Sequence, residues 1–258
     1  MKRRLVLRIL TLVLVMGGYP IKAQESLAPT TESEKSESFA EKVNNDLTNL
    51  IGSSTILIPQ APQPIKSDLD AREYRYLVLP NQLKVLLISD PESQSSAAAV
   101  NVAVGSNQNP PERLGLAHFL EHMLFLGTEK YPLPGEYQQY IAQQGGTHNA
   151  STAAENTLFY FNVRHQAFEP ALDRFSQFFI APLFNEIYVE RERQAVQAEF
   201  SAKLTDDFRR EWDVLRELMN SQHPGSQFAV GNSQTLADRE GDLVRDDLID
   251  FLSITLFG

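Results

Sequence analysis

The stretch GLAHFLEHMLF, residues 115–125, places two histidines and one glutamate among apolar residues and one glycine. On an α-helix, His118 and His122 are four residues apart, so both imidazoles project from one face and can converge on one ion. The apolar neighbours leave no polar face that would keep His118, Glu121 and His122 in water. Burying such groups without partners costs about 2 kcal/mol or more each. A bound metal ion would satisfy them directly.

The alternative is a pair of core histidines that donate hydrogen bonds to backbone carbonyls, which is the usual explanation of a lone histidine on an apolar face. The chain has five histidines in 258 residues, so a chance match to the pattern H-x-x-E-H is rare. This order is typical of the inverted zincin motif of zinc peptidases. We therefore interpret residues 118–122 as a metal-binding motif.

A hydrolytic zinc site needs a third protein ligand and an open position for water. In ERERQAVQAEF, residues 190–200, Glu199 shares a helical stripe with small apolar residues, which predicts that its carboxylate faces apolar surroundings. Glu192 lies two turns earlier on the same stripe. The residues alone leave open which glutamate is the ligand and which one orients or tunes the site. A solvated charged helix is the alternative, and it explains Glu190 and Arg191 better than Glu199.

Residues 1–23 have the pattern of a secretory signal peptide. Basic residues precede an apolar run from Ile9 to Met16, and Ala23 is a small residue before a cleavage point. The run is too short to span a bilayer comfortably and no later stretch is long enough, so a retained membrane anchor is the less favoured alternative. We expect an exported protein, periplasmic in a bacterium, with no stable membrane anchor after cleavage.

The composition excludes some kinds of chemistry and of partner. The chain has no cysteine, so thiolate ligands, cysteine nucleophiles and disulfides are excluded. Removal of residues 1–23 takes away five basic residues and moves the formal net charge from -10 to -15. Such an acidic protein is not expected to bind nucleic acid.

Residues 24–71 are rich in Ser, Glu, Thr, Lys and Pro, which predicts a disordered leader or linker before a folded domain over residues 72–258. Strands are predicted in YRYLVLP (74–80) and LKVLLIS (83–89), which form a hairpin, and in SAAAVNVAVGS (96–106) and THNASTAAENTLFYFNVR (147–164). Helices are predicted around the H-x-x-E-H motif, in GEYQQYIAQQ (135–144), over about 168–180, and from about 187 towards 219. Locally paired strands with covering helices predict an α+β fold, a two-layer sandwich of a mostly antiparallel sheet and helices.

The stretches GLAHFLEHMLFLGTEKYP, GGTHNASTA, ERERQAVQAEF and HPGSQFAVGN closely resemble the pitrilysin or insulinase family of zinc peptidases, over about residues 72–250. In that family, a glutamate separated by 76 residues from the second motif histidine completes the site, and 76 residues lie between His122 and Glu199. The resemblance implies one Zn²⁺ per chain, held by His118, His122 and Glu199. It also implies that Glu192 supports catalysis without binding zinc.

The function implied by the resemblance is that of a zinc metalloendopeptidase acting on peptides or small unfolded proteins. The ion would lower the pKa of a bound water to about 7, and Glu121 would act first as general base and then as general acid. The segment GGTHNAST would form an edge strand on which the substrate adds as a further strand, with Asn149 and Ala150 in contact with it. From the sequence alone, this segment could also be a helix end followed by a loop.

The resemblance covers the first part of the family's pattern. Members are longer, or work as two chains, and enclose the peptide between two halves; the arginine and tyrosine that the C-terminal half contributes have no counterpart here. We therefore expect a C-terminally truncated first domain that requires a C-terminal half or a second subunit to close the chamber. The alternative is a noncatalytic zinc- and peptide-binding fragment or assembly partner. Cleavage specificity and oligomeric state stay open.

Overall fold

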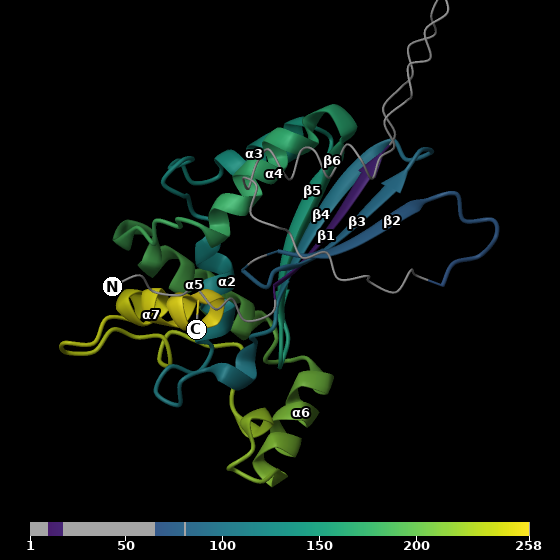
Figure 1. Ribbon diagram of the computed structural model, residues 1–258. Helices are drawn as coiled ribbons and strands as arrows, with labels where there is room; N and C mark the ends of the chain where they lie inside the picture. Colours follow the sequence, from purple (N-terminus) through teal and green to yellow (C-terminus); the bar gives the residue numbers. More distant parts are fainter. Residues whose placement is uncertain (1–9, 18–64, 80, 258) are drawn as a thin grey trace, which may run out of the picture.

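A six-stranded sheet forms one layer of the protein, and helices cover one of its faces (Figure 1). The computed structural model describes residues 10–17, 65–79 and 81–257. The strands are β1 (Leu10–Gly17), β2 (Glu73–Val78), β3 (Lys84–Asp90), β4 (Ser95–Val102), β5 (Thr147–Thr152) and β6 (Thr157–Arg164), in the spatial order β2-β3-β1-β4-β6-β5. All neighbours pair antiparallel except β1 and β3, which are parallel. The predicted α+β fold with a mostly antiparallel sheet is confirmed, as is the β2–β3 hairpin.

The helices are α2 (Leu116–Leu124), α3 (Glu136–Gln143), α4 (Phe168–Ser176), α5 (Glu186–Ala202), α6 (Asp207–Leu218) and α7 (Val244–Phe257). Short 3₁₀ turns lie at Ser106–Gln108, His165–Ala167, Gln177–Phe179 and Pro224–Ser226. The helical region predicted from residue 187 towards 219 is divided in two. The Asp206 carboxylate accepts a hydrogen bond from the N–H of Arg209 and so begins α6 as a separate helix.

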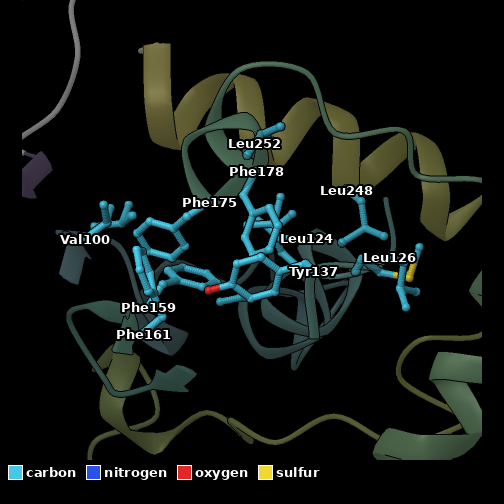
Figure 2. Packing of buried hydrophobic residues seen from close by; sticks show 14 of the residues in the cluster. Val100, Leu124, Leu126, Tyr137, Phe159, Phe161, Phe175, Phe178, Leu248 and Leu252 are labelled. Carbon is cyan, nitrogen blue, oxygen red and sulfur yellow. The ribbon is translucent and has the colours of Figure 1, made fainter. Parts of the chain in front are cut away.

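The core lies between the sheet and the helices and is rich in aromatic rings (Figure 2). On β6, buried and more exposed residues alternate, so that Phe159 and Phe161 face the helices. Tyr137 of α3 meets Phe178 with ring centroids 4.8 Å apart, and Phe161 meets Phe175 of α4 at 5.1 Å. Both pairs are edge-to-face, an arrangement that stabilises aromatic clusters beyond the burial of their area.

Helix α2 lies deep in this core. The side chains of Leu116 and Phe119 are fully buried. Just before the helix, Arg113 is also buried, and its guanidinium donates to the Asp247 carboxylate at 2.5 Å, to Asp242 at 2.8 Å and to the carbonyl of Ala237. These contacts tie the entry of α2 to α7 and to the loop before it. The helix that carries the H-x-x-E-H motif is therefore held in a fixed position.

Strand β1 lies in the middle of the sheet, between β3 and β4, although its residues belong to the predicted signal peptide. Cleavage of residues 1–23 stays a prediction. The predicted leader or linker of residues 24–71 lies, up to residue 64, outside the described residues; residues 65–71 have no helix or strand, and β2 begins close to the predicted start of the domain. Among the described residues, no helix combines the length and the apolar character needed to cross a membrane.

Candidate metal centre

His118 and His122 lie side by side on α2, one helical turn apart. Their ring centroids are 4.8 Å apart and the ring planes are nearly perpendicular. The rest of α2 is almost entirely buried, but these two side chains are 18% and 16% exposed because they reach a cavity of about 1100 Å³. The helical spacing predicted this shared face, and the tertiary structure opens it to a space in which a ligand can bind.

The carboxylate of Glu199 on α5 faces both rings across this cavity. Its two oxygens lie 3.5 Å from His118 Nε2 and 3.6 Å from His122 Nε2. One ligand atom from each of the three residues lies within 4.8 Å of the others, which is compatible with a single ion between them. The sequence reasoning for Glu199 was wrong in one respect: its side chain is 54% exposed, because it opens on the cavity rather than on an apolar surface.

The ring nitrogens that face away from Glu199 are held by other groups. His118 Nδ1 donates to the backbone carbonyl of Val230 at 2.8 Å, and His122 Nδ1 lies 3.5 Å from a carboxylate oxygen of Glu192. Metal-binding histidines usually have such a partner, which fixes the ring and leaves the other nitrogen free for the ion. The arrangement therefore directs both Nε2 atoms towards Glu199.

The charges around the two rings favour a cation. Burial lowers the pKa of His122, but the carboxylates of Glu192, Glu199 and Glu121 outweigh it, and the pKa ends above its ordinary value. The contact with His122 lowers the pKa of Glu192 in spite of its burial. Three carboxylates around two imidazoles leave an excess of negative charge, most of which a dication would offset. The donor set, two imidazoles and a carboxylate, is one that zinc prefers.

Glu121 lies on α2 between the two histidines and is 9% exposed. One of its carboxylate oxygens accepts a hydrogen bond from the hydroxyl of Thr152 at 2.6 Å. Sequence reasoning missed Thr152, although a signal existed: in a strand, Thr152 points to the same side as Ala150, two residues earlier. It also missed Val230, whose contribution is a backbone carbonyl and leaves no side-chain signal.

The segment containing Asn149 and Ala150 forms β5, at one end of the strand order. Both residues line the cavity, and no described strand pairs with the outer edge of β5. The start of this strand requires glycine, because a Cβ on Gly146 would lie 1.9 Å from the carbonyl oxygen of Asn162. Nearby, His148 packs against Phe125 with ring centroids 5.6 Å apart, and burial lowers its pKa.

Comparisons with known proteins show the family to which the chain belongs. Residues 84–223 match the family described as Insulinase (Peptidase family M16). The insulin-degrading enzyme of Homo sapiens is 45% identical over 215 residues, which are 82% of this chain and 20% of that enzyme. Protease 3 of Escherichia coli (strain K12) is 44% identical over 186 residues, 72% of this chain and 19% of the other.

The fold has a counterpart among solved structures. The crystal structure of pitrilysin matches with a TM-score of 0.73 and 42% sequence identity, over 76% of this chain and 21% of that chain. This likeness confirms the predicted resemblance to the pitrilysin-type fold. The chain spans about a fifth of the length of the relatives that it matches.

Proposed function

Since the chain belongs to the insulinase (M16) family of peptidases, we propose that it is a zinc metalloendopeptidase, or the catalytic part of one, acting on peptides or small unfolded proteins. The observation that carries the proposal is the convergence of two imidazoles and one carboxylate on an open cavity that the carboxylate of Glu121 also lines. His118, His122 and Glu199 hold one zinc ion per chain. When bound, the ion supplies a Lewis acid and an activated water.

Glu121 transfers protons during hydrolysis. Its carboxylate takes the proton of the attacking water and passes it to the leaving amine, as general base and then general acid. The hydrogen bond from Thr152 holds one carboxylate oxygen, so the other stays available for the proton. Glu192 orients His122 and keeps its Nε2 directed to the ion.

The substrate lies along β5. The edge of this strand that no described strand covers offers backbone N–H and C=O groups to an extended peptide, which adds as a further strand. Asn149 and Ala150 contact the peptide where β5 lines the cavity. This places the scissile bond between the edge strand and the histidines of α2.

Turnover requires a C-terminal half or a second subunit that closes the cavity over the peptide. We further propose export through the signal peptide of residues 1–23, to the periplasm in a bacterium. The second candidate function is that of a noncatalytic zinc- and peptide-binding fragment or assembly partner. The openness of the cavity to solvent favours it for the chain acting alone, because half of the Glu199 side chain remains exposed.

Turnover of a quenched fluorogenic peptide separates the two functions. The purified, zinc-loaded chain is compared with Glu121→Gln, each alone and with any C-terminal partner encoded downstream. We expect hydrolysis by the parent chain only, while elemental analysis finds one zinc in both proteins. Equal rates for the two proteins would exclude catalysis, and zinc with peptide binding but no turnover under any condition would favour the second function.

A further inference from the structure

The wall of the cavity formed by α5, α6 and the turn between them is rich in basic side chains. Five cations from this part of the chain line the cavity: Arg191, Lys203, Arg209, Arg210 and Arg216. The protein as a whole has a formal net charge of -10. A local concentration of positive charge beside the metal centre therefore differs from the rest of the molecule.

Three of these five cations have carboxylate partners. The pairs are Arg191 with Glu192 at 3.0 Å, Arg210 with Asp207 at 3.3 Å, and Arg216 with Asp213. Lys203 and Arg209 form no ion pair with any residue that the structure describes, and both are exposed. These two cations are thus available to an anionic group that enters the cavity.

The carboxylates of the cavity do not cancel this charge. Two of the four that line it, Glu192 and Asp213, are already in the ion pairs above. The other two are Glu121 and Glu199, and the charge of a dication held by the histidines and Glu199 would offset them. With the ion in place, the charged groups that line the cavity carry a net positive charge, and a cleft with charge of one sign attracts ligands of the opposite sign.

The position of Lys203 relates this charge to the proposed substrate. Lys203 follows Glu199 by four residues at the end of α5, a rise of about 6 Å along the helix. An extended peptide advances about 3.3 Å per residue, so a side chain about two residues from the scissile bond can reach this wall. Strand β5, along which the proposed peptide lies, lines the same cavity.

We propose that Lys203 and Arg209 form a subsite for an acidic side chain, so that the chain selects peptides with Asp or Glu within about three residues of the bond held at the metal centre. The inference rests on the proposed function for the place of the peptide. It adds the chemical class of the substrate. Exposed ion pairs contribute modestly, and two of them predict a preference of about threefold to tenfold at low ionic strength.

The test uses binding, so that it does not depend on turnover. Trp212 is the only tryptophan of the chain and lines the same cavity, so its fluorescence reports occupancy. Peptides of one sequence, with Glu, Gln or Lys at each position within three residues of the centre, are titrated into zinc-loaded Glu121→Gln protein. Anisotropy of a labelled peptide provides a second signal. We expect the Glu peptide to bind about threefold to tenfold more tightly than the Gln peptide, and the difference to decrease with salt.

Charge reversal identifies the residues responsible. In the Glu121→Gln background, Lys203→Glu with Arg209→Glu is expected to reverse the order, so that the Lys peptide binds best. Lys84→Glu, on β3 and outside the cavity, changes a single charge in the same direction and should leave the preference intact. Circular dichroism and zinc content establish that each variant is folded.

The outcomes separate the inference from the proposed function. An unchanged preference for Glu after charge reversal would contradict the subsite, because the acidic side chain would then bind elsewhere, for example at the ion. Equal binding of all three peptides would also contradict it and would leave the proposed function standing. If no peptide binds at this cavity of the zinc-loaded protein, either alone or with its C-terminal partner, both are wrong.

Discussion

The Nδ1 atom of each histidine in the candidate metal centre lies beside an acceptor. The orientation of the two rings therefore depends on residues outside the proposed ligand set. Val230 supplies one acceptor through its backbone and Glu192 supplies the other through its side chain. The same principle applies to Glu121, which is oriented by the hydroxyl of Thr152. Substitution of the orienting residues should therefore change function while the ligands remain in place.

Thr152→Val removes the donor to Glu121 and keeps the size and β-branching of the side chain. We expect peptide hydrolysis by the assembled, zinc-loaded enzyme to fall by about tenfold, with unchanged zinc content. Thr152→Ser keeps the hydroxyl and should retain most of the activity. Measurement of kcat and KM for the two variants checks this, and equal rates for Val and Ser would show that the hydrogen bond does not matter.

The affinity for zinc should fall as the pH is lowered, and Glu192 should affect the pH at which the fall begins. Protons compete with the ion for His122, whose pKa lies above the ordinary value of 6.5 because its three carboxylate neighbours outweigh the effect of burial. Affinity should therefore begin to fall at a pH above 6.5 as the pH is lowered. In Glu192→Gln the pKa of His122 decreases, so the fall should move to lower pH. Zinc titrations against a competing chelator at a series of pH values measure this shift.

The same pKa shift has the opposite consequence in the zinc-free chain. A histidine whose pKa is raised on folding stabilises the folded state fully below its unfolded pKa, and this contribution is lost as the pH rises through the folded pKa. Zinc-free protein should thus lose this contribution above about pH 6.5, while zinc-loaded protein gains stability there. Thermal unfolding with and without chelator distinguishes the two trends; parallel curves would contradict the assignment.

At the level of elements, α2 depends on close contact with the loop that carries Val230. The helix begins after Gly115, whose φ of 94° favours glycine, and a Cβ there would lie 2.2 Å from Cα of Gly231. The two glycines let the loop approach the helix closely enough for the Val230 carbonyl to accept from His118. The packing of this loop against α2 therefore affects the orientation of His118.

Gly115→Ala should reduce both the stability of the protein and its affinity for zinc, because the loop must move away from His118. Gly135→Ala is the matched control: its φ of 82° imposes similar strain, but nothing lies within 4 Å of the added Cβ. We expect the control to cost about 1 kcal/mol in the free energy of unfolding and to leave zinc affinity unchanged. Chemical denaturation and zinc titration measure the two effects, and equal zinc affinities of both variants would refute the coupling.

In the molecule as a whole, β1 occupies a central position in the sheet, which the sequence did not predict. The strand pairs with β3 on one side and β4 on the other, over seven and six residue pairs. A segment removed by a signal peptidase cannot also occupy the sheet. The predicted signal peptide and the observed strand are therefore alternative uses of the same residues.

Deletion of residues 1–23 should leave β3 and β4 without their shared partner. We expect faster amide hydrogen exchange in both strands and a lower melting temperature than in the full chain. Deletion of residues 1–9 alone removes the basic start and keeps β1, so it should resemble the full chain. Identical exchange of β3 and β4 in the full chain and both deletions would show that β1 contributes nothing to the sheet.

Features that depend on residues close together in the chain could be predicted before the structure. The four-residue spacing of His118 and His122 predicted their common face, and two strand-like segments on either side of residues 80–82 predicted the β2–β3 hairpin, because backbone geometry relates such residues before any long-range contact forms. The H-x-x-E-H order and the stretches around it indicated the family, and the family's spacing then implied Glu199 as the third ligand. Such features can be recognised in the sequence without knowledge of the fold.

Contacts between groups that are far apart in the chain became known from the folded structure. It brought the carbonyl of Val230 to His118 and the hydroxyl of Thr152 to Glu121, it exposed Glu199 to a cavity, and it placed β1 inside the sheet. Backbone acceptors and strand partners have no side-chain signature, and the exposure of a helix face depends on what packs against it. For that reason, spacing predicted the common face of His118 and His122 and the family resemblance implied the roles of Glu199 and Glu192, whereas neither predicted the contacts of Val230 and Thr152.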